Sequence, residues 1–281
     1  MTTFYTKRAF LLPFLILFLS AWQLNADVLE FGQDLTESID AIGATNQYTF
    51  EAAAGDAIVL RMRGNKNGVD ACLRLLDPNG LEIAAECSTG LAEIRTSLPL
   101  SGTYKVLAYD NNHNGDFGIS LELLNQPFYA EKLTCQASVV GELKHNGAAK
   151  MYALPLEAGE VIRLIVQGGD AGIEPILELY DESGQEVAVS KRDKGRAQIT
   201  AFVVPETGTY ALLMTDENGN DLGLFEIGFQ YLNKSSACAI TMGCSEAIAA
   251  SLDSEVELDV YRLDAAAGEN NVAKKRSDED N

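Results

Sequence analysis

Two acidic loops hold the residues whose types and spacing are best suited to chemistry. Residues 110–116 read Asp-Asn-Asn-His-Asn-Gly-Asp, and residues 216–220 read Asp-Glu-Asn-Gly-Asn. Oxygen-bearing side chains at alternate loop positions can point toward one hard cation, which is the arrangement that calcium prefers. The candidate Ca²⁺ ligands are Asp110, Asn112, Asn114, Asp116, Asp216, Asn218 and Asn220.

Only half of a calcium-loop pattern is present. The twelfth position, where an EF-hand loop places a bidentate Glu, holds Leu121 in one loop and Ile227 in the other. The alternative interpretation, which the composition favours, is a hairpin loop in which Asn, Asp and Gly adopt left-handed backbone. Ca²⁺ is the candidate cofactor, and the sequence indicates no other.

Catalytic motifs are missing from the sequence. It contains no His-Glu-x-x-His, no Gly-x-Ser-x-Gly and no phosphate loop. The two histidines, His113 and His145, lie in a loop and in a polar turn, and we expect both at the surface. We therefore predict no catalytic residues and a protein that is not an enzyme.

The overall charge narrows the possible partners. The chain has 281 residues, with 21 Lys and Arg against 41 Asp and Glu, for a formal charge of −20. Nucleic acids and anionic membrane surfaces repel such a polyanion. The 47% of hydrophobic residues are ample for packed cores.

The N-terminus has the pattern of an export signal. Lys7 and Arg8 precede an apolar run at residues 9–21, and small residues up to Ala26 suit cleavage. The run is shorter than the ~20 residues needed to span a membrane. We predict a signal peptide at residues 1–26, no membrane insertion after its removal, and a secreted, periplasmic or cell-surface protein. Cleavage would change the formal charge to −22, because the segment carries two basic residues and no acidic one.

The elements that must position the acidic loops recur along the chain. Tyr48 and Gly55 match Tyr152 and Gly159 at an offset of 104 residues, and Tyr261 and Gly268 repeat the pair at 109. Such self-similarity indicates tandem structural repeats. We predict repeats at residues 27–128 and 129–238, an incomplete third repeat at 239–269 and a disordered charged tail at 270–281.

Each repeat reads as β-structure throughout. Short β-branched runs such as residues 57–63 and 161–166 alternate with turn signals such as Asp77-Pro78-Asn79-Gly80. Seven or eight short strands in each repeat predict an all-β fold of tandem antiparallel, jelly-roll-like β-sandwiches.

The ordered landmarks of both copies resemble the bacterial pre-peptidase C-terminal domain. They are Tyr48, Gly55, Asp56, Asp77, Gly80, Gly102 and Tyr104 in the first copy, and Tyr152, Gly159, Glu160, Asp181, Gly184, Gly208 and Tyr210 in the second. The resemblance implies a jelly-roll-like sandwich on secreted bacterial proteins, usually appended to peptidases or other exoenzymes. It also implies binding of matrix polymers such as collagen, or of calcium, in some members. In this chain the copies follow the signal directly, with no catalytic domain between them.

Five cysteines follow the signal segment in what should be an oxidising compartment. Cys72 and Cys87 flank one turn, and the second copy has Ile176 and Lys191 at the equivalent positions. Because both cysteines are absent together there, we predict that Cys72 and Cys87 form a disulfide. Cys135 and Cys238 lie at the two ends of the second copy, and a disulfide between them would close it. A local Cys238–Cys244 loop remains the alternative.

We predict a secreted, non-catalytic binding or accessory protein for adhesion, matrix binding or association with an exoenzyme, its partner an extracellular protein or matrix polymer. The alternative is a truncated fragment of a larger secreted peptidase or other exoenzyme. Tandem repetition favours the first hypothesis, because two weak sites in one chain gain avidity.

Overall fold

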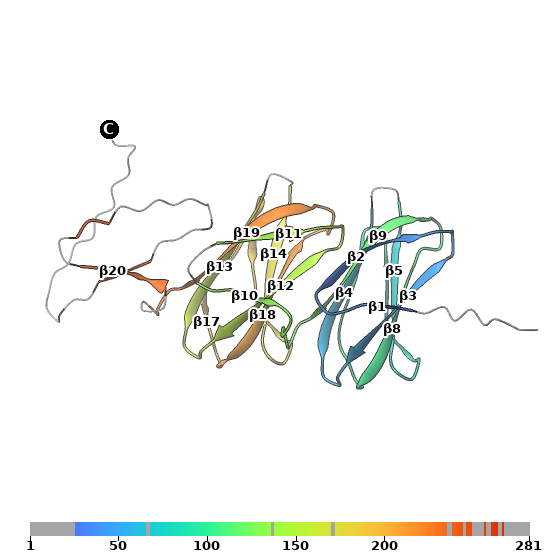
Figure 1. Cartoon of the computed structure of the whole chain (residues 1–281), viewed down its shortest axis with the longest axis horizontal. Helices are drawn as coiled ribbons and strands as arrows, with labels where there is room; N and C mark the ends of the chain where they lie inside the picture. The colour runs from blue at the N-terminus through green and yellow to red at the C-terminus, as the bar shows by residue number, and fades with distance from the viewer. Residues whose placement is uncertain are drawn as a thin grey trace, which may run out of the picture.

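The computed structural model describes residues 26–65, 68–135, 138–169, 172–234, 238–243, 246–248, 256, 260–263 and 266. The elements assigned in these ranges are β-strands, and apart from one short two-stranded sheet near the C-terminus they form two sandwiches side by side (Figure 1). This confirms the predicted all-β sandwich fold. The predicted signal peptide, apart from Ala26, and the predicted tail lie outside the described residues.

The first sandwich pairs a five-stranded sheet with a four-stranded sheet. The five-stranded sheet has the order β1-β3-β8-β5-β6, with bounds Asp27–Val28, Thr45–Ala52, Gly102–Tyr109, Ala71–Leu76 and Glu82–Ser88. The four-stranded sheet has the order β2-β9-β4-β7, with bounds Gln33–Ile39, Gly115–Leu123, Ala57–Gly64 and Leu91–Ser97.

The second sandwich repeats this topology with one additional edge strand. Its first sheet has the order β10-β12-β18-β14-β15, with bounds Glu131–Lys132, Ala149–Leu156, Gly208–Asp216, Pro175–Tyr180 and Glu186–Val189. Its second sheet has the order β11-β19-β13-β17-β16, with bounds Val139–Leu143, Gly223–Tyr231, Val161–Gly168, Arg196–Val203 and Lys191–Asp193.

One edge of each sandwich pairs in parallel, which the antiparallel prediction did not include. In the first sandwich Asp27 lies opposite Tyr48, and in the second Glu131 lies opposite Tyr152. A third parallel pair joins β20 (Ile240–Met242) to β21 (Tyr261–Leu263), with Ile240 opposite Tyr261. The three pairs are offset by the same 104 and 109 residues as the tyrosine landmarks, so the sequence repeat is also a repeat of strand register.

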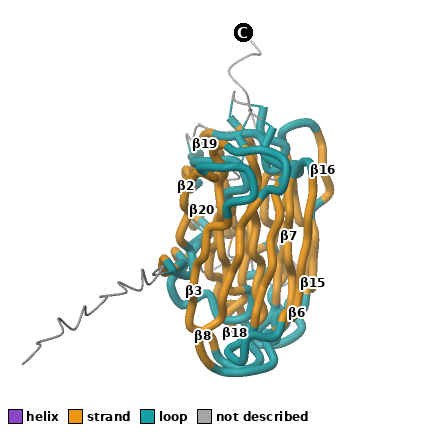
Figure 2. The backbone as a smooth tube through the Cα atoms, turned by 90° about the vertical axis from the view of Figure 1, so that its right-hand side faces the viewer, coloured by secondary structure: helices purple, strands orange, loops and turns teal. Residues whose placement is uncertain are grey.

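Each sandwich has its own core between its two sheets, and a third apolar cluster joins the sandwiches. The first two clusters centre on the inward faces of β4 and β13. The third comprises Ala57, Val59, Leu124, Ala149, Met151, Tyr180, Ala211 and Leu213. Strand β4 is buried on both faces along its first six residues, because one face lines a core and the other packs against the next sandwich. Figure 2, in which the sandwiches overlap along the view, shows the strands of both running in nearly the same direction.

Buried tyrosine hydroxyls anchor equivalent corners of the two sandwiches. The Tyr104 hydroxyl donates to the Leu100 carbonyl at 2.7 Å, and the Tyr210 hydroxyl donates to the Glu206 carbonyl at 2.9 Å. Each bond ties the start of a strand to the turn before it, as in a tyrosine corner. These two tyrosines therefore have a structural role.

Candidate functional site

The first acidic loop is organised around the carboxylate of Asp110. One oxygen accepts hydrogen bonds from the backbone amides of Asn112 and His113, at 2.7 and 3.2 Å. The other accepts from the backbone amide of Asp70 at 2.6 Å. Burial favours the neutral acid, but the amide donors outweigh it and lower the pKa of Asp110 below its usual value.

The imidazole of His113 and the carboxylate of Asp70 complete a small polar cluster. Nδ1 of His113 lies 3.3 Å from Oδ2 of Asp110 and 3.9 Å from Oδ2 of Asp70. The side chain of Asp110 is 1% exposed, whereas that of His113 is 48% exposed, so His113 is at the surface as expected. Among the described Asp, Glu, His and Cys residues, these three alone bring a ligand atom each within 4.8 Å of the others.

The second acidic loop has the same clamp but a different environment. Oxygens of Asp216 accept from the backbone amides of Glu174 at 2.8 Å and Asn220 at 3.0 Å. Its backbone, however, faces the first sandwich: Arg61 donates to the Asp216 carbonyl at 3.2 Å and Arg63 to the Asn218 carbonyl at 2.5 Å. The loop therefore lies at the junction between the sandwiches, next to two cations.

The predicted calcium ligands do not share one environment. Asp110 and Asp216 are buried and hold backbone amides, whereas Asn112, Asn114 and Asp116 are exposed, as are Asn218 and Asn220. Asp116 belongs to strand β9, where it pairs with Ser38. Calcium binding by these loops remains a prediction, and the hydrogen bonds match the hairpin-loop alternative.

Arg61 lies at the centre of the junction between the sandwiches, because it contacts residues of both. It is 1% exposed, yet its guanidinium crosses the junction and donates to the Ala148 carbonyl at 2.9 Å. Its Nε lies 3.0 Å from a carboxylate oxygen of Glu93 within its own sheet. Burial lowers the pKa of Arg61, and Glu93 opposes this effect. The buried charge is therefore paired and hydrogen-bonded, which burial of a charge requires.

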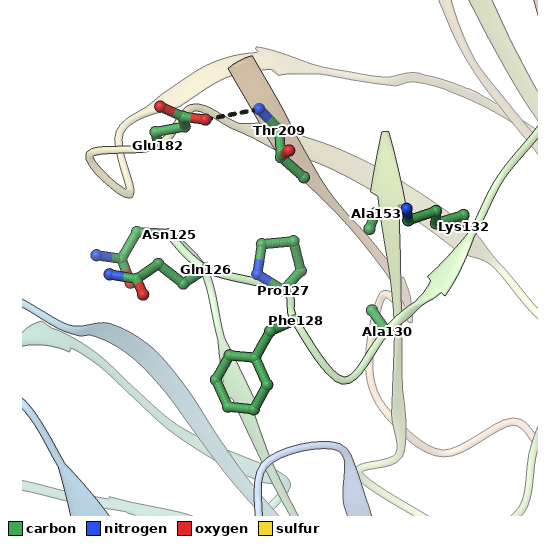
Figure 3. A pocket seen from close by; sticks show the side chains of 9 residues that line it. All are labelled: Asn125, Gln126, Pro127, Phe128, Ala130, Lys132, Ala153, Glu182 and Thr209. Carbon is green, nitrogen blue, oxygen red and sulfur yellow. Dashed lines mark hydrogen bonds between the residues drawn. The ribbon is translucent and has the colours of Figure 1, made fainter. Parts of the chain in front are cut away.

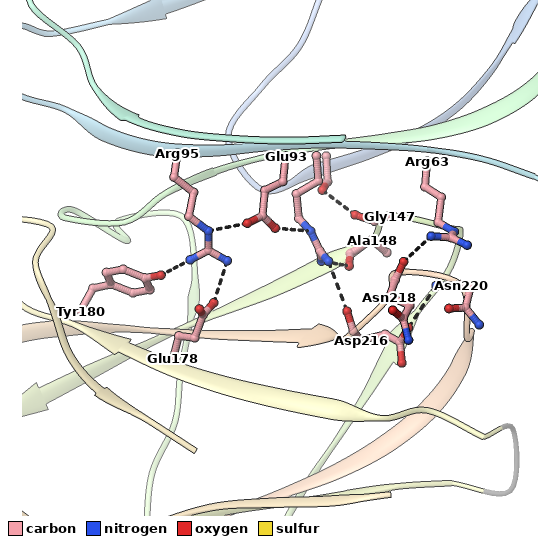
Figure 4. A network of polar contacts seen from close by, with 12 residues as sticks. Arg63, Glu93, Arg95, Gly147, Ala148, Glu178, Tyr180, Asp216, Asn218 and Asn220 are labelled. Atoms are coloured by element: carbon pink, nitrogen blue, oxygen red, sulfur yellow. Dashed lines mark hydrogen bonds and ion pairs between the residues drawn. The ribbon is translucent and has the colours of Figure 1, made fainter. Parts of the chain in front are cut away.

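A second arginine extends the network along the same face. Arg95 shares Glu93 with Arg61, forms an ion pair with Glu178 at 2.9 Å and hydrogen-bonds the Tyr180 hydroxyl (Figure 4). Burial raises the pKa of Glu178, with Arg95 opposing it. The chain of contacts thus alternates charge from one sandwich to the other.

A cavity of about 360 Å³ lies beside the linker between the two sandwiches, residues 124–130. Its lining includes Asp34, Glu122, Tyr129 and Lys150. Glu122 is 2% exposed and accepts a hydrogen bond from the Tyr129 hydroxyl at 2.6 Å. Burial raises the pKa of Glu122 to about 8, although the bond from Tyr129 opposes the shift. Glu122 is therefore a largely neutral acid near pH 7.

His145 was expected at the surface, and this prediction is wrong. It is 6% exposed, because its turn packs against the first sandwich, and its Nε2 lies 3.3 Å from Oδ1 of Asp34. Burial disfavours the imidazolium, but the contact with Asp34 outweighs burial and raises the pKa of His145. The polar His145 suits this buried turn because it contacts the carboxylate of Asp34 in the first sandwich.

A groove of about 520 Å³ follows the linker itself (Figure 3). Its lining includes Gln126, Pro127, Phe128, Lys132 and Glu182. The Phe128 side chain is 77% exposed, and Glu182 is held in place by the backbone amide of Thr209 at 2.8 Å. We call this the junction groove. Its lining combines the apolar Phe128 and Pro127 with one cation, Lys132, and one anion, Glu182.

Both predicted disulfides are present. Cys72 and Cys87 face each other across β5 and β6 with Cα atoms 4.1 Å apart. Cys135 and Cys238 join the ends of the second sandwich with Cα atoms 5.7 Å apart. The Cys238–Cys244 alternative is therefore wrong, because Cys238 is bonded to Cys135. Disulfides of this kind are typical of proteins outside the cytoplasm.

No helix in the described ranges combines the length and apolar character that crossing a membrane requires.

Comparison with known proteins gives distant structural likenesses. No family model and no curated protein matches the chain. Among solved structures, it is similar to the pre-peptidase C-terminal domain of a collagenase from Bacillus anthracis, at 18% identity and a TM-score of 0.32, covering 36% of this chain and 94% of that one. It is similar to PliG of Aeromonas hydrophila, a periplasmic inhibitor of g-type lysozyme, at 18% identity and a TM-score of 0.29, covering 34% and 94%. A third likeness, to the major capsid protein P2 of bacteriophage PM2, has 11% identity and a TM-score of 0.22 over 72% of this chain and 99% of that one.

These scores are too low to carry a functional argument, and the first two likenesses cover about a third of this chain each. The resemblance of the landmark residues to the pre-peptidase C-terminal domain therefore remains a sequence-based prediction.

Sequence reasoning missed the junction between the sandwiches. Its main signal was available at Ala57 and Val59, which are apolar although they share a strand face with Arg61 and Arg63. A strand with one solvated face shows regular polar alternation. The break in that alternation marked a second packing partner.

Proposed function

We propose that this chain is a non-catalytic binding or accessory protein that acts outside the cytoplasm, and that the junction groove is its ligand site. The observation that carries the proposal is Phe128, an aromatic side chain that is 77% exposed in a groove between two locked sandwiches. Phe128 joins Pro127 and Ala130 in the lining of this groove, and a contiguous apolar surface rimmed by polar residues is typical of an interaction site.

The chemistry of the groove favours a polypeptide ligand. Phe128 and Pro127 offer apolar contact, and Gln126, Lys132 and Glu182 offer hydrogen bonds or charge to peptide groups and side chains. An extended segment of an extracellular protein or of a proteinaceous matrix polymer fits this combination. The junction network supports the idea, because a groove between rigid bodies needs no ordering when the ligand binds.

The test uses residues 27–281 purified from the periplasm and immobilised for surface plasmon resonance. The probes are soluble collagen, gelatin and a secreted protein fraction from the native host, each tested with and without about 2 mM calcium. This concentration is ~10 times the Kd of a weak extracellular calcium site, so such a site would be largely occupied. We expect Phe128→Ala to weaken binding of the active probe at least ~10-fold, the size of effect expected for a binding hot spot.

Leu81→Ala is the matched control, because Leu81 is 66% exposed in the distant Asp77–Leu81 turn. It should leave binding unchanged. Equal binding by both variants would remove the groove as the site, and hydrolysis of a protease or glycosidase substrate panel by the pure protein would overturn the non-catalytic assignment.

A further inference from the structure

We propose that Asp70, Asp110 and His113, here called the His113 triad, bind a divalent transition-metal ion such as Zn²⁺ at the open end of the first sandwich. The site is independent of the junction groove. It differs from the predicted calcium loop, because it uses an imidazole nitrogen and a carboxylate from a different loop.

The distances within the triad match one coordination sphere. Zn²⁺ binds His nitrogen and carboxylate oxygen at ~2.1 Å, so neighbouring ligand atoms of a tetrahedral site are ~3.4 Å apart. Nδ1 of His113 lies 3.3 Å from Asp110 and 3.9 Å from Asp70. All three ligand atoms lie within 4.8 Å of one another, so one ion can bind between them once the exposed His113 and Asp70 side chains adjust, and water would fill the remaining position.

The backbone has already fixed the central ligand. Three amide donors hold the Asp110 carboxylate, and its side chain is 1% exposed. One of these donors is the amide of Asp70 itself, so the same hydrogen bond that locks Asp110 also brings the second carboxylate into range. Hydrogen bonds to a ligating carboxylate are the supports that orient metal ligands in proteins.

The second sandwich shows which part of this arrangement the fold requires. Asp216 and Glu174 repeat the carboxylate and amide of Asp110 and Asp70, but the position of His113 is taken by Gly219. A Cβ on Gly219 would lie 3.3 Å from Leu91 of the first sandwich. The loop therefore folds without an imidazole, and His113 is an addition confined to the open loop.

The ligand set favours a transition metal over calcium. Calcium takes six to eight oxygen ligands, whereas imidazole with two carboxylates suits Zn²⁺ and related ions. Ions reach the triad from solvent, since the side chains of His113 and Asp70 are 48% and 34% exposed. The net negative charge of the chain favours the approach of divalent cations.

The experiment is isothermal titration of EDTA-treated protein, residues 27–281 with Cys244→Ser to remove the fifth cysteine as a competing ligand. Zn²⁺ and Ca²⁺ are titrated separately. We expect one Zn²⁺ per chain, and at least a ~10-fold loss of affinity in His113→Asn and in Asp70→Asn, the range seen when a metal site loses a supporting group. Asp116→Asn is the control, since it removes the same charge from an exposed position next to the triad, and it should leave Zn²⁺ affinity unchanged.

Proton NMR provides a readout apart from affinity. The chain has two histidines, and Zn²⁺ should shift the imidazole signals of His113 and leave those of buried His145 in place. Zn²⁺ binding that persists in His113→Asn, Ca²⁺ binding that depends on Asp116 in place of His113, or no heat with Zn²⁺ would each overturn the proposal. Circular dichroism of the apo variants confirms that they are folded.

Discussion

Replacing Arg61 by Ala should weaken the junction between the sandwiches by about 3–5 kcal/mol, mainly because two carbonyls lose a charged donor, whereas Glu93 keeps its pair with Arg95. The variant loses the ion pair to Glu93 and both hydrogen bonds to the Ala148 and Asp216 carbonyls. A hydrogen bond from a charged donor contributes ~1.5–3 kcal/mol. The two carbonyls would each lose their guanidinium donor, while the relief of Arg61 desolvation offsets part of the total.

Two readouts test this value. Urea unfolding followed by far-UV circular dichroism gives the free energy of unfolding, and calorimetry reports whether the sandwiches unfold together. Since the junction couples two separate cores, we expect the Arg61→Ala protein to show two transitions where the parent shows one. Small-angle scattering should show a broader distribution of distances between the sandwiches.

Arg74→Ala is the matched control. Arg74 pairs with Glu82 at 2.5 Å, but its side chain is 44% exposed on the outer sheet of the first sandwich. Exposed pairs contribute ~0–1 kcal/mol, so this variant should unfold almost as the parent does. If Arg61→Ala loses no more stability than Arg74→Ala and keeps a single transition, the reasoning about the junction is refuted.

Three further predictions follow from single contacts. Replacing both Cys72 and Cys87 by Ala should cost ~3 kcal/mol, the entropy of closing a loop of about 15 residues, measured by urea unfolding under oxidising conditions. Glu122→Gln should flatten the pH profile of stability. The pKa of Glu122 in the folded state is raised to about 8, so the native state keeps this proton and the parent protein loses stability as the pH rises from ~4.5 to ~8. A variant whose Tm changes with pH as steeply as the parent's between these values would contradict the prediction. Tyr104→Phe should cost ~0.5–1.5 kcal/mol through the lost bond to Leu100, and a smaller change in the unfolding midpoint would remove the corner's role.

The sequence predicted the features that recur in both copies, and it did not predict the contacts between the sandwiches or between separate loops. Tyr48 and Tyr152 indicated the repeat of 104 residues, and the joint loss of Cys72 and Cys87 in the second copy indicated their pairing. Such features are local, or they compare equivalent positions. The contact between Asp70 and His113 spans two loops 43 residues apart, and nothing in either segment announces the other.

His145 shows the same limit from the other side. A histidine in a polar turn is expected in solvent, and that expectation holds for an isolated domain. Here the turn is buried because Asp34 of the preceding sandwich covers it. The error came from treating each repeat as a body with its own complete surface.

Amino-acid differences at equivalent positions of the two copies explain which face of each sandwich packs against the other. Met151 and Ala211 of the second sandwich pack against the first, whereas the equivalent Gln47 and Lys105 on the first sandwich face away from the junction and are polar. Of the two equivalent sheets β1-β3-β8-β5-β6 and β10-β12-β18-β14-β15, the second therefore carries the apolar outer face that docks. In repeat arrays, a polar outer face blocks further stacking at that side.

The opposite sheet of each sandwich receives the segment that follows it. Arg61 on β4 corresponds to Ile165 on β13, and Ile165 is 1% exposed although it lies on the outer face of its sheet. Gly228 beside it lies close to the backbone of Val256, so chain from beyond the second sandwich covers this face. Equivalent outer-face positions of the two sandwiches are thus buried with a charged residue, Arg61, in the first and an apolar residue, Ile165, in the second. Arg61 is explained by its own acceptors, the carbonyls of Ala148 and Asp216, which a consensus of the repeats would not predict.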